Sequence, residues 1–392
     1  MWKRDSIFHF ERFGYLGRIS STTSSSYIFR FLVLRHSSMN ASLFISISTK
    51  IFRPVGTIIM IVALSPLVIP RALASSSWIV GDRISVKGDG FWDHVTLQTE
   101  EHRLFVAHHD RLEVIDLLTR AEIASISGQN LCKASIVPAL NCGFVTDGDA
   151  GNVIVFDLKT LENKGTIKTD PDADAICYEP VTRRIFTFNG DSHSATVIDP
   201  VRAEVISTLP LDGSPESAEA DGQGAIFVDI SDKDEVQKID AAESKIVQRW
   251  TLPAKSKPTT IALDKKNNRV FIGCRNQTIL ILDGVSGKEL VSLKIGKWVD
   301  DTLYDPVRRR VFACCGDGTL TVIRQDSADS YAVEGVVQTE LGVHTMAFDS
   351  TTNTIYAPAA KLKPISPENP HPHPQPIPGT FHILVLTETT NP

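Results

Sequence analysis

The sequence lacks the features that mark several common functional classes. It contains no Cys-x-x-Cys-His string, which excludes covalently attached c-type haem, and no Gly-x-Ser-x-Gly elbow, which disfavours a serine hydrolase. Helical patterns are scarce after residue 74, and aromatic residues make up only 7% of the 392-residue chain. What is present is Val, Ile, Thr and Phe in short runs between Gly, Asp, Asn and Pro, a composition typical of strands joined by turns.

A short apolar stretch that ends in aspartate recurs at a nearly constant interval. Successive copies are 41, 42, 41 and 43 residues apart and end at Asp116, Asp157, Asp199, Asp240 and Asp283. A period of about 40 to 45 residues is typical of the four-stranded blade of a β-propeller. We interpret these aspartates as turn residues whose carboxylates accept backbone N–H groups, and not as a catalytic set.

Each repeat is expected to supply four antiparallel strands. In the third repeat the alternation and turn residues place them at 174–178, 184–189, 195–199 and 204–209. The sequence therefore predicts an all-β fold, a seven-bladed β-propeller of four-stranded antiparallel sheets. Its inner strands begin near Asp93, Lys133, Asp174, Ser217, Thr259, Asp300 and His344.

The last blade lacks an outer strand of its own. Its second and third strands are expected at Ile355-Tyr356 and at Phe381 to Leu386, and no further strand follows. We predict that the alternating segment Trp78 to Val86 supplies the missing strand and closes the ring, which removes an exposed sheet edge. Between the two strands, residues 358–379 are rich in proline and carry His371 and His373. Because proline interrupts strand pairing, we expect a projecting loop suited to contact with a partner.

Residues 1–74 lie outside the repeat. Lys50 and Arg53 precede an uncharged apolar run from Val55 to Ile69, and Ala72-Leu73-Ala74 follows. This order is typical of a secretory signal peptide, so we expect cleavage after Ala74 and a periplasmic or secreted propeller over residues 75–392. A retained membrane anchor is the alternative, although the run is short for a spanning helix. Translation is expected to start at Met39.

Charge argues against nucleic acid as a partner. Residues 1–74 hold nine of the 40 basic and two of the 46 acidic residues, so the remainder carries a formal net charge of −13. DNA affinity depends on basic residues that neutralise phosphates. We therefore expect a monomer that binds an unidentified protein or small molecule, with membrane contact only through an uncleaved leader.

The six cysteines are Cys132, Cys142, Cys177, Cys274, Cys314 and Cys315. An even number in an exported protein permits disulfides. Their predicted places on strands favour small buried apolar residues instead. A bond from Cys274 to Cys314 or Cys315 and a vicinal Cys314–Cys315 bond remain as alternatives.

Several strings resemble the YncE-like, YVTN-repeat family of bacterial propellers. They are Asp-Pro-Val-Arg-Arg-Arg-Val-Phe (Asp305 to Phe312), Phe-Thr-Phe-Asn-Gly (Phe186 to Gly190), Gly90 to Asp93 and Phe271 to Asn276. The resemblance covers about Trp78 to Leu386. It implies an exported, quinoprotein-like seven-bladed propeller with no established enzyme activity. The Tyr-Val-Thr-Asn string itself is absent, and Gly-His and Trp-Asp pairs do not occur in the WD40 arrangement.

The residues that enter the inner strands are the candidates for a ligand site, because inner strands converge on the central channel of a propeller. The candidates are His94, Lys133, Asp174, Glu216, Thr259, Asp300 and His344. His94, His344 and Asp300 could together hold a divalent cation, since imidazole and carboxylate are compatible ligands. His371 and His373 are a weaker metal pair.

Three functions are compatible with these patterns. The leading hypothesis is a non-catalytic exported propeller that acts as a binding or scaffold module of the cell envelope. The alternatives are a metal-dependent, lactonase-like hydrolase that uses the central funnel, and an envelope-associated DNA-binding protein. The first requires no cofactor, and the second requires the divalent cation.

Overall fold

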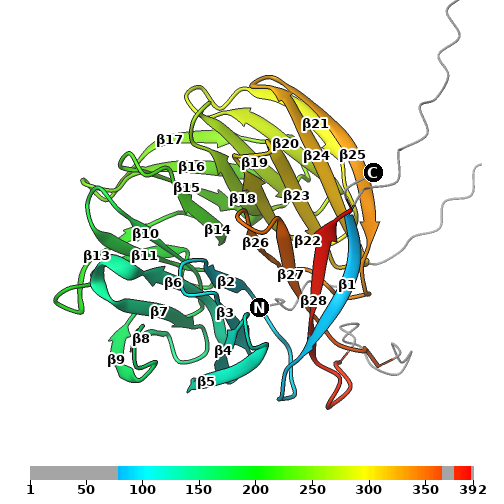
Figure 1. Ribbon diagram of the computed structural model, residues 1–392. Coiled ribbons are helices and arrows are strands. Elements are labelled where there is room, and N and C mark those ends of the chain that lie inside the picture. The colour runs from blue at the N-terminus through cyan, green and yellow to red at the C-terminus, as the bar shows by residue number, and fades with distance from the viewer. Residues whose placement is uncertain (1–77, 364–374, 390–392) are drawn as a thin grey trace, which may run out of the picture. The chain divides into compact units, whose positions relative to one another are not determined.

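The computed structural model describes residues 78–363 and 375–389, which form seven four-stranded antiparallel sheets (Figure 1). The inner strands of successive sheets contact one another, and the inner strand of the seventh sheet contacts that of the first, so the ring closes. The described residues contain two short 3-10 turns, η1 (Pro138–Leu140) and η2 (Ser231–Lys233), and no helix long and apolar enough to cross a membrane. The predicted all-β, seven-bladed fold is confirmed.

Blades one to six each use four consecutive strands, from the channel outward. They are β2 (Val95–Gln98), β3 (Arg103–His108), β4 (Arg111–Asp116) and β5 (Ala121–Ser127); β6 (Leu131–Val137), β7 (Cys142–Asp147), β8 (Asn152–Asp157) and β9 (Asn163–Lys168); β10 (Ala173–Glu179), β11 (Arg184–Asn189), β12 (Ser194–Asp199) and β13 (Glu204–Pro210); β14 (Pro215–Ala220), β15 (Ala225–Ile230), β16 (Glu235–Asp240) and β17 (Lys245–Thr251); β18 (Pro258–Asp264), β19 (Arg269–Cys274), β20 (Thr278–Asp283) and β21 (Glu289–Lys294); β22 (Val299–Asp305), β23 (Arg310–Cys315), β24 (Thr319–Ser327) and β25 (Ser330–Gln338).

The seventh blade joins both ends of the described chain. Its order is β26 (Ala347–Asp349), β27 (Thr354–Ala359), β28 (His382–Glu388) and β1 (Trp78–Ser85), and β1 pairs antiparallel with β28. Trp78 is 3% exposed and packs edge-on against Phe312 of the neighbouring blade. The prediction that an early segment closes the ring is therefore confirmed.

The strand before the proline-rich segment is longer than the sequence suggests. Pro358 and Ala359 lie within β27 and are paired in register with Ile383 and His382. A proline is tolerated there because it is next to the end of the strand, where few ladder hydrogen bonds follow. His371 and His373 lie outside the described residues, so their predicted metal role has no structural test.

The recurring aspartates cap turns, as expected. The carboxylate of Asp116 accepts the backbone N–H of Thr119 at 2.6 Å, and Asp283 accepts the backbone N–H groups of Val285 and Ser286. Asp157, Asp199 and Asp240 make equivalent bonds. The sequence did not predict a second set of capping acids. Four inner strands end in an acid whose carboxylate accepts N–H groups of the next turn in the same way: Glu179, Asp264, Asp305 and Asp349.

The core lies between the blades. The third residue of the second strand is phenylalanine in six blades, and all six side chains are at most 4% exposed: Phe105, Phe144, Phe186, Phe227, Phe271 and Phe312. Tyr356 holds the same position in the seventh blade. Burial of each ring contributes about 1.5–3 kcal/mol relative to exposure, so the repeat stabilises every interface between blades.

The six cysteines are free thiols, five of them buried and Cys177 half-buried. Burial raises the pKa of Cys274 and of Cys315 to about 12. Both thiols are therefore protonated and unreactive at neutral pH. They occupy the same last position of β19 and β23, where they pack as small apolar residues.

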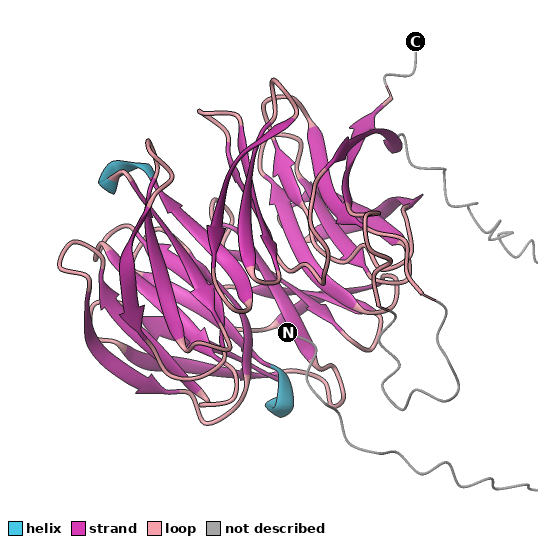
Figure 2. Ribbon diagram, turned by 90° about the horizontal axis from the view of Figure 1, so that it is seen from below, coloured by secondary structure: helices cyan, strands magenta, loops and turns pink. Residues whose placement is uncertain are grey.

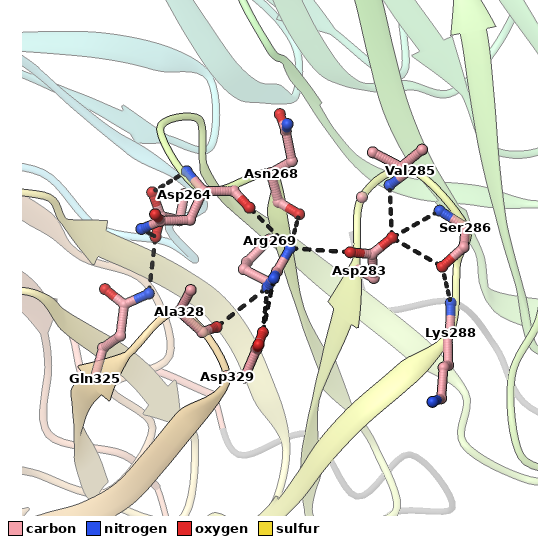
Figure 3. A network of polar contacts seen from close by, with 12 residues as sticks. Asp264, Asn268, Arg269, Asp283, Val285, Ser286, Lys288, Gln325, Ala328 and Asp329 are labelled. Atoms are coloured by element: carbon pink, nitrogen blue, oxygen red, sulfur yellow. Dashed lines mark hydrogen bonds and ion pairs between the residues drawn. The ribbon is translucent and has the colours of Figure 1, made fainter.

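Arginines clamp adjacent blades together. Arg103, Arg184, Arg269 and Arg310 each begin a second strand and donate to the next blade. Figure 3 shows Arg269 bonded to the carbonyl of Ala328 and the carboxylate of Asp329 in blade six, and to Asp283 in its own blade. A half-buried guanidinium with several acceptors holds strand ends whose carbonyls would otherwise lack donors.

The turns lie on two opposite faces of the ring (Figure 2). The mouth face carries the connections into the inner strands and the turns between second and third strands. The turn face carries the turns between first and second strands and between third and fourth strands. The capping acids and the clamping arginines just described belong to the turn face.

Candidate ligand site at the channel mouth

The predicted candidates lie at one end of the ring, and β-bulges position most of them. The pairing of the first and second strands slips by one residue at the start of blades two to six. These bulges contain the candidates Lys133, Asp174, Glu216, Thr259 and Asp300, and two of them also contain Cys132 and Ser217. A bulge redirects a side chain out of the regular alternation, here at the channel entrance. The sequence predicted which residues enter the channel, but it contains no signal for the bulges.

His94 and His344 lie at the same end, just before β2 and β26, on the two sides of the join between blades one and seven. The hydroxyl of Thr345 donates to the carbonyl of Asp93 at 2.8 Å, which links these two entrances. Nε2 of His94 lies 3.8 Å from the carboxylate of Asp93. The His344 ring stacks on Trp92, with centroids 5.5 Å apart. Closure of the ring thus brings the two entrances together.

Arg275 connects two of the candidates. It follows β19, and its guanidinium lies 2.7 Å from the carboxylate of Asp300 and 3.1 Å from the hydroxyl of Thr259. The sequence-based reading missed Arg275 because it followed only the starts of inner strands. This residue reaches the mouth from the far end of a second strand.

Two acids of the mouth are hard to ionise. Burial, together with the negative charges of Asp172 and Glu216, raises the pKa of Asp174 to about 7. Burial also raises the pKa of Asp301 to about 7, although the ammonium of Lys133 and the N–H of Met346 favour its charged form. Both acids therefore change charge near neutral pH, which makes the mouth sensitive to a bound charge.

Lys133 is a cation of the channel wall. Its positive charge acts on His94, on Asp301 and on the deeper acid Glu219, which come from three other blades. Burial, together with the charge of Lys133, lowers the pKa of His94 to about 4. His94 is thus a neutral imidazole at physiological pH, able to accept or donate a hydrogen bond.

A second-strand acid supports the bulge of blade four. Asp229 is fully buried, and one of its oxygens accepts the backbone N–H of Ser217 at 2.8 Å. Its other oxygen has no hydrogen-bond partner among the described residues. Burial and the charge of Glu216 raise the pKa of Asp229 well above its ordinary range. Thr146 supports the bulge at Lys133 in a similar way, through its hydroxyl.

In the described ranges, no group of three or more His, Cys, Asp or Glu side chains has an arrangement that could hold a metal ion. The carboxylate of Asp300, a candidate ligand, is paired with the guanidinium of Arg275. A divalent cation at His94, His344 and Asp300 therefore stays a sequence-based hypothesis.

Two surface hollows lie away from the mouth. One, of about 420 Å³, is bordered by Asp82, Arg120 and Tyr356 beside the closing strand. The other, of about 180 Å³, lies between blades one and two near Arg103 and Lys159. Neither includes a mouth residue, and neither gathers groups with shifted pKa comparable to those of the mouth.

Comparison with known proteins supports the fold alone. No protein-family model matches the chain, and no curated protein matches it. Among solved structures, the WD40 repeats of RRP9 superpose with a TM-score of 0.65 at 9% sequence identity, over 78% of this chain and 97% of that one. At this identity the likeness shows the propeller fold alone. The YVTN-repeat resemblance stays a prediction.

Proposed function

We propose that the chain is an exported, non-catalytic β-propeller that binds a ligand at its channel mouth, as a binding or scaffold module of the cell envelope. The observation that carries this proposal is the set of bulges that turn polar side chains toward the entrance in five successive blades. Bulges between third and fourth strands also occur near the turn-face end, but they lie in the outer half of each blade. The bulges of the inner strands place side chains at the channel entrance, where a ligand could contact them.

The mouth favours a ligand that carries a cationic group. Its acids include Asp93, Asp174, Glu216 and Asp301, whereas the bases that contact or act on these candidates include Lys133 and Arg275, the latter already paired. A bound cation stabilises the ionised form of Asp174 and Asp301, whose pKa values lie near 7. Binding should therefore release protons and strengthen as the pH rises through about 7.

Native mass spectrometry of the purified protein tests the proposal. We expect a co-purifying ligand on the unaltered protein and its loss in the Asp174→Asn, Glu216→Gln variant. The matched control, Glu100→Gln with Glu101→Gln on the turn face, should keep it. A protein that carries the same ligand in all three forms, or that carries none and gains no partner from an envelope extract, contradicts a mouth site.

Export is the second part of the proposal. Val55 to Ile69 and the Ala72-Leu73-Ala74 string lie outside the described residues, so support comes from the sequence alone. N-terminal sequencing of the protein recovered from the periplasm or medium should find Ser75 as the first residue. A chain that retains its leader in the membrane fraction would support the anchor alternative. Nothing in the described residues favours the hydrolase or DNA-binding alternative.

A further inference from the structure

At five of the seven joins between blades, a basic side chain of the earlier blade donates to the later one. At four joins this base is the arginine that begins a second strand: Arg103, Arg184, Arg269 and Arg310. At the join between blades four and five it is Lys238, whose Nζ lies 3.5 Å from the carbonyl oxygen of Gly284. The acceptor carbonyl at three of these joins belongs to the residue that follows a third-strand aspartate: Leu158, Ala241 and Gly284. A base with an oxygen acceptor in the next blade is thus a recurring element of the ring.

The join between blades seven and one differs at both positions of this base. Thr354 begins the second strand of blade seven, where the arginines stand, and its hydroxyl donates within its own blade. Val385 is paired with Tyr356 in the same way as Lys238 is paired with Phe227, so Val385 holds the position of the lysine. Neither Thr354 nor Val385 can supply a positive charge.

The larger of the two surface hollows opens at this join, and we call it the seam hollow. Its volume is about 420 Å³, and both Thr354 and Val385 line it. Asp82, Arg120 and the half-buried Tyr356 also line it. The seam hollow therefore lies where a base of the chain itself stands at other joins.

The surroundings of Lys238 indicate what the seam hollow can accept. Its Nζ lies 5.1 Å from the centroid of the Phe227 ring, and the same atom bonds to the carbonyl of the next blade. Tyr356 holds the place of Phe227 in blade seven. Leu117 holds the place of Gly284 in blade one, and no side chain in the described ranges donates to its carbonyl. An aromatic face with an oxygen acceptor beside it is favourable for a cation.

We propose that the seam hollow binds an alkylammonium or guanidinium group, supplied by a small amine or by a side chain of a partner. Burial raises the pKa of Tyr356, the negative charge of Asp349 raises it as well, and the charge of Arg120 lowers it. Among the groups that line the hollow or act on Tyr356, the two acids Asp82 and Asp349 thus face one base. This site is separate from the channel mouth and does not depend on a ligand there.

Arg120 competes with such a ligand. Its guanidinium lies 2.9 Å from the carboxylate of Asp82, and the two side chains are 50% and 65% exposed. An ion pair this exposed is weak, so a bound cation can take the carboxylate from Arg120. Removal of the Arg120 charge should therefore strengthen the binding of a cation, whereas it would weaken the binding of an anion.

Titration of the full chain with agmatine, which carries a guanidinium and an ammonium group, tests the proposal by ligand-observed NMR. The protein carries Asp174→Asn and Glu216→Gln, so that binding at the mouth is weakened. Thr354→Arg places the chain's own guanidinium in the hollow, so it should lower the affinity about tenfold and raise the melting temperature. Asp82→Asn should lower the affinity about threefold, and Arg120→Gln should raise it about threefold.

Cys142→Arg is the matched control, because Cys142 also begins a second strand, at a join that neither surface hollow borders. It should leave agmatine binding unchanged. Thr354→Val keeps the hollow open and should retain binding, which separates filling of the hollow from a general effect of substitution at this position. Nα-acetyl-arginine methylamide distinguishes the two sources: equal affinity supports a partner's side chain, and binding of agmatine alone supports a small amine.

Three results would overturn the proposal. The first is agmatine binding that persists in the Thr354→Arg protein, and the second is binding that weakens in the Arg120→Gln protein. The third is binding that is seen only before the mouth substitutions, or at no agmatine concentration up to about 10 mM. Binding seen only before the mouth substitutions would belong to the mouth and would support the proposed function instead.

Discussion

On the turn face, the acids at strand ends accept N–H groups from the turn that follows, and arginines join neighbouring blades. On the mouth face, bulges of the inner strands place side chains at the channel entrance, and buried acids such as Asp301 have raised pKa values. The first arrangement satisfies polar groups and stabilises the fold. In the second, burial disfavours the charged form of the acids, and a bound cationic ligand would stabilise it. The turn face therefore stabilises the fold, and the mouth face is suited to recognition.

The largest expected difference concerns two arginines. Arg269 on the turn face is 13% exposed and bonds to two carboxylates and several carbonyls, so Arg269→Ala should lower the free energy of unfolding by about 3 kcal/mol. Arg275 at the mouth is 26% exposed, and Arg275→Ala should cost about 1 kcal/mol. Urea denaturation measures both.

The exposed pair of Arg324 with Asp326 is the control for this comparison, and Arg324→Ala should leave the free energy of unfolding nearly unchanged. If Arg269→Ala and Arg275→Ala lowered the free energy of unfolding equally, the turn face would not be the more stabilising of the two. A larger loss for Arg275→Ala would make the mouth face the more stabilising one.

The next effect appears in the pH dependence of stability. Asp174 and Asp301 keep their protons up to pH about 7 when folded, but only to about 3.9 when unfolded. The folded state binds more protons in between, so these two acids lower stability as the pH rises from 4 to 7. Asp174→Asn with Asp301→Asn should therefore gain about 2 kcal/mol over the unaltered protein at pH 8, and little at pH 4. Urea titrations at both values measure this.

Asp264, on the turn face, contributes a pH dependence of stability with the opposite sign. Although burial opposes it, hydrogen bonds from Gln325 and Asn267 lower its pKa. Its stabilising contribution is present above the unfolded pKa and is lost as the pH falls through the folded value. Asp264→Asn should thus be destabilising at pH 7 and nearly neutral at pH 2. The same sign for Asp264 and Asp301 would contradict the contrast between the faces.

The smallest effect is expected at a bulge. Glu216→Gln removes a charge that raises the pKa values of Asp174 and Asp229. Stability at pH 7 should be unchanged or rise by about 0.5 kcal/mol. Thermal and urea denaturation measure it, with Glu101→Gln on the turn face as the control. A loss above about 1 kcal/mol would mean that Glu216 supports the blade rather than the mouth.

Much of the fold could be predicted because its determinants are local. The 41- to 43-residue interval, the acids after third strands and the alternation of β11 are visible along the chain, and each follows from the period of a strand or the needs of a turn. The pairing of β1 with β28 was also predictable, because blade seven lacks a strand that only the first segment could supply.

The chain by itself determined that seven sheets form, where each begins, and which residues enter the channel. Only the tertiary structure decided that bulges present five of those residues, that Arg275 pairs with Asp300, that Pro358 stays within β27, and that Asp174 and Asp301 titrate near neutral pH. The physical reason is the separation along the chain of the residues that interact. Turn chemistry and strand alternation act over a few residues, whereas burial and charge at the mouth depend on groups contributed by different blades, which only ring closure brings together.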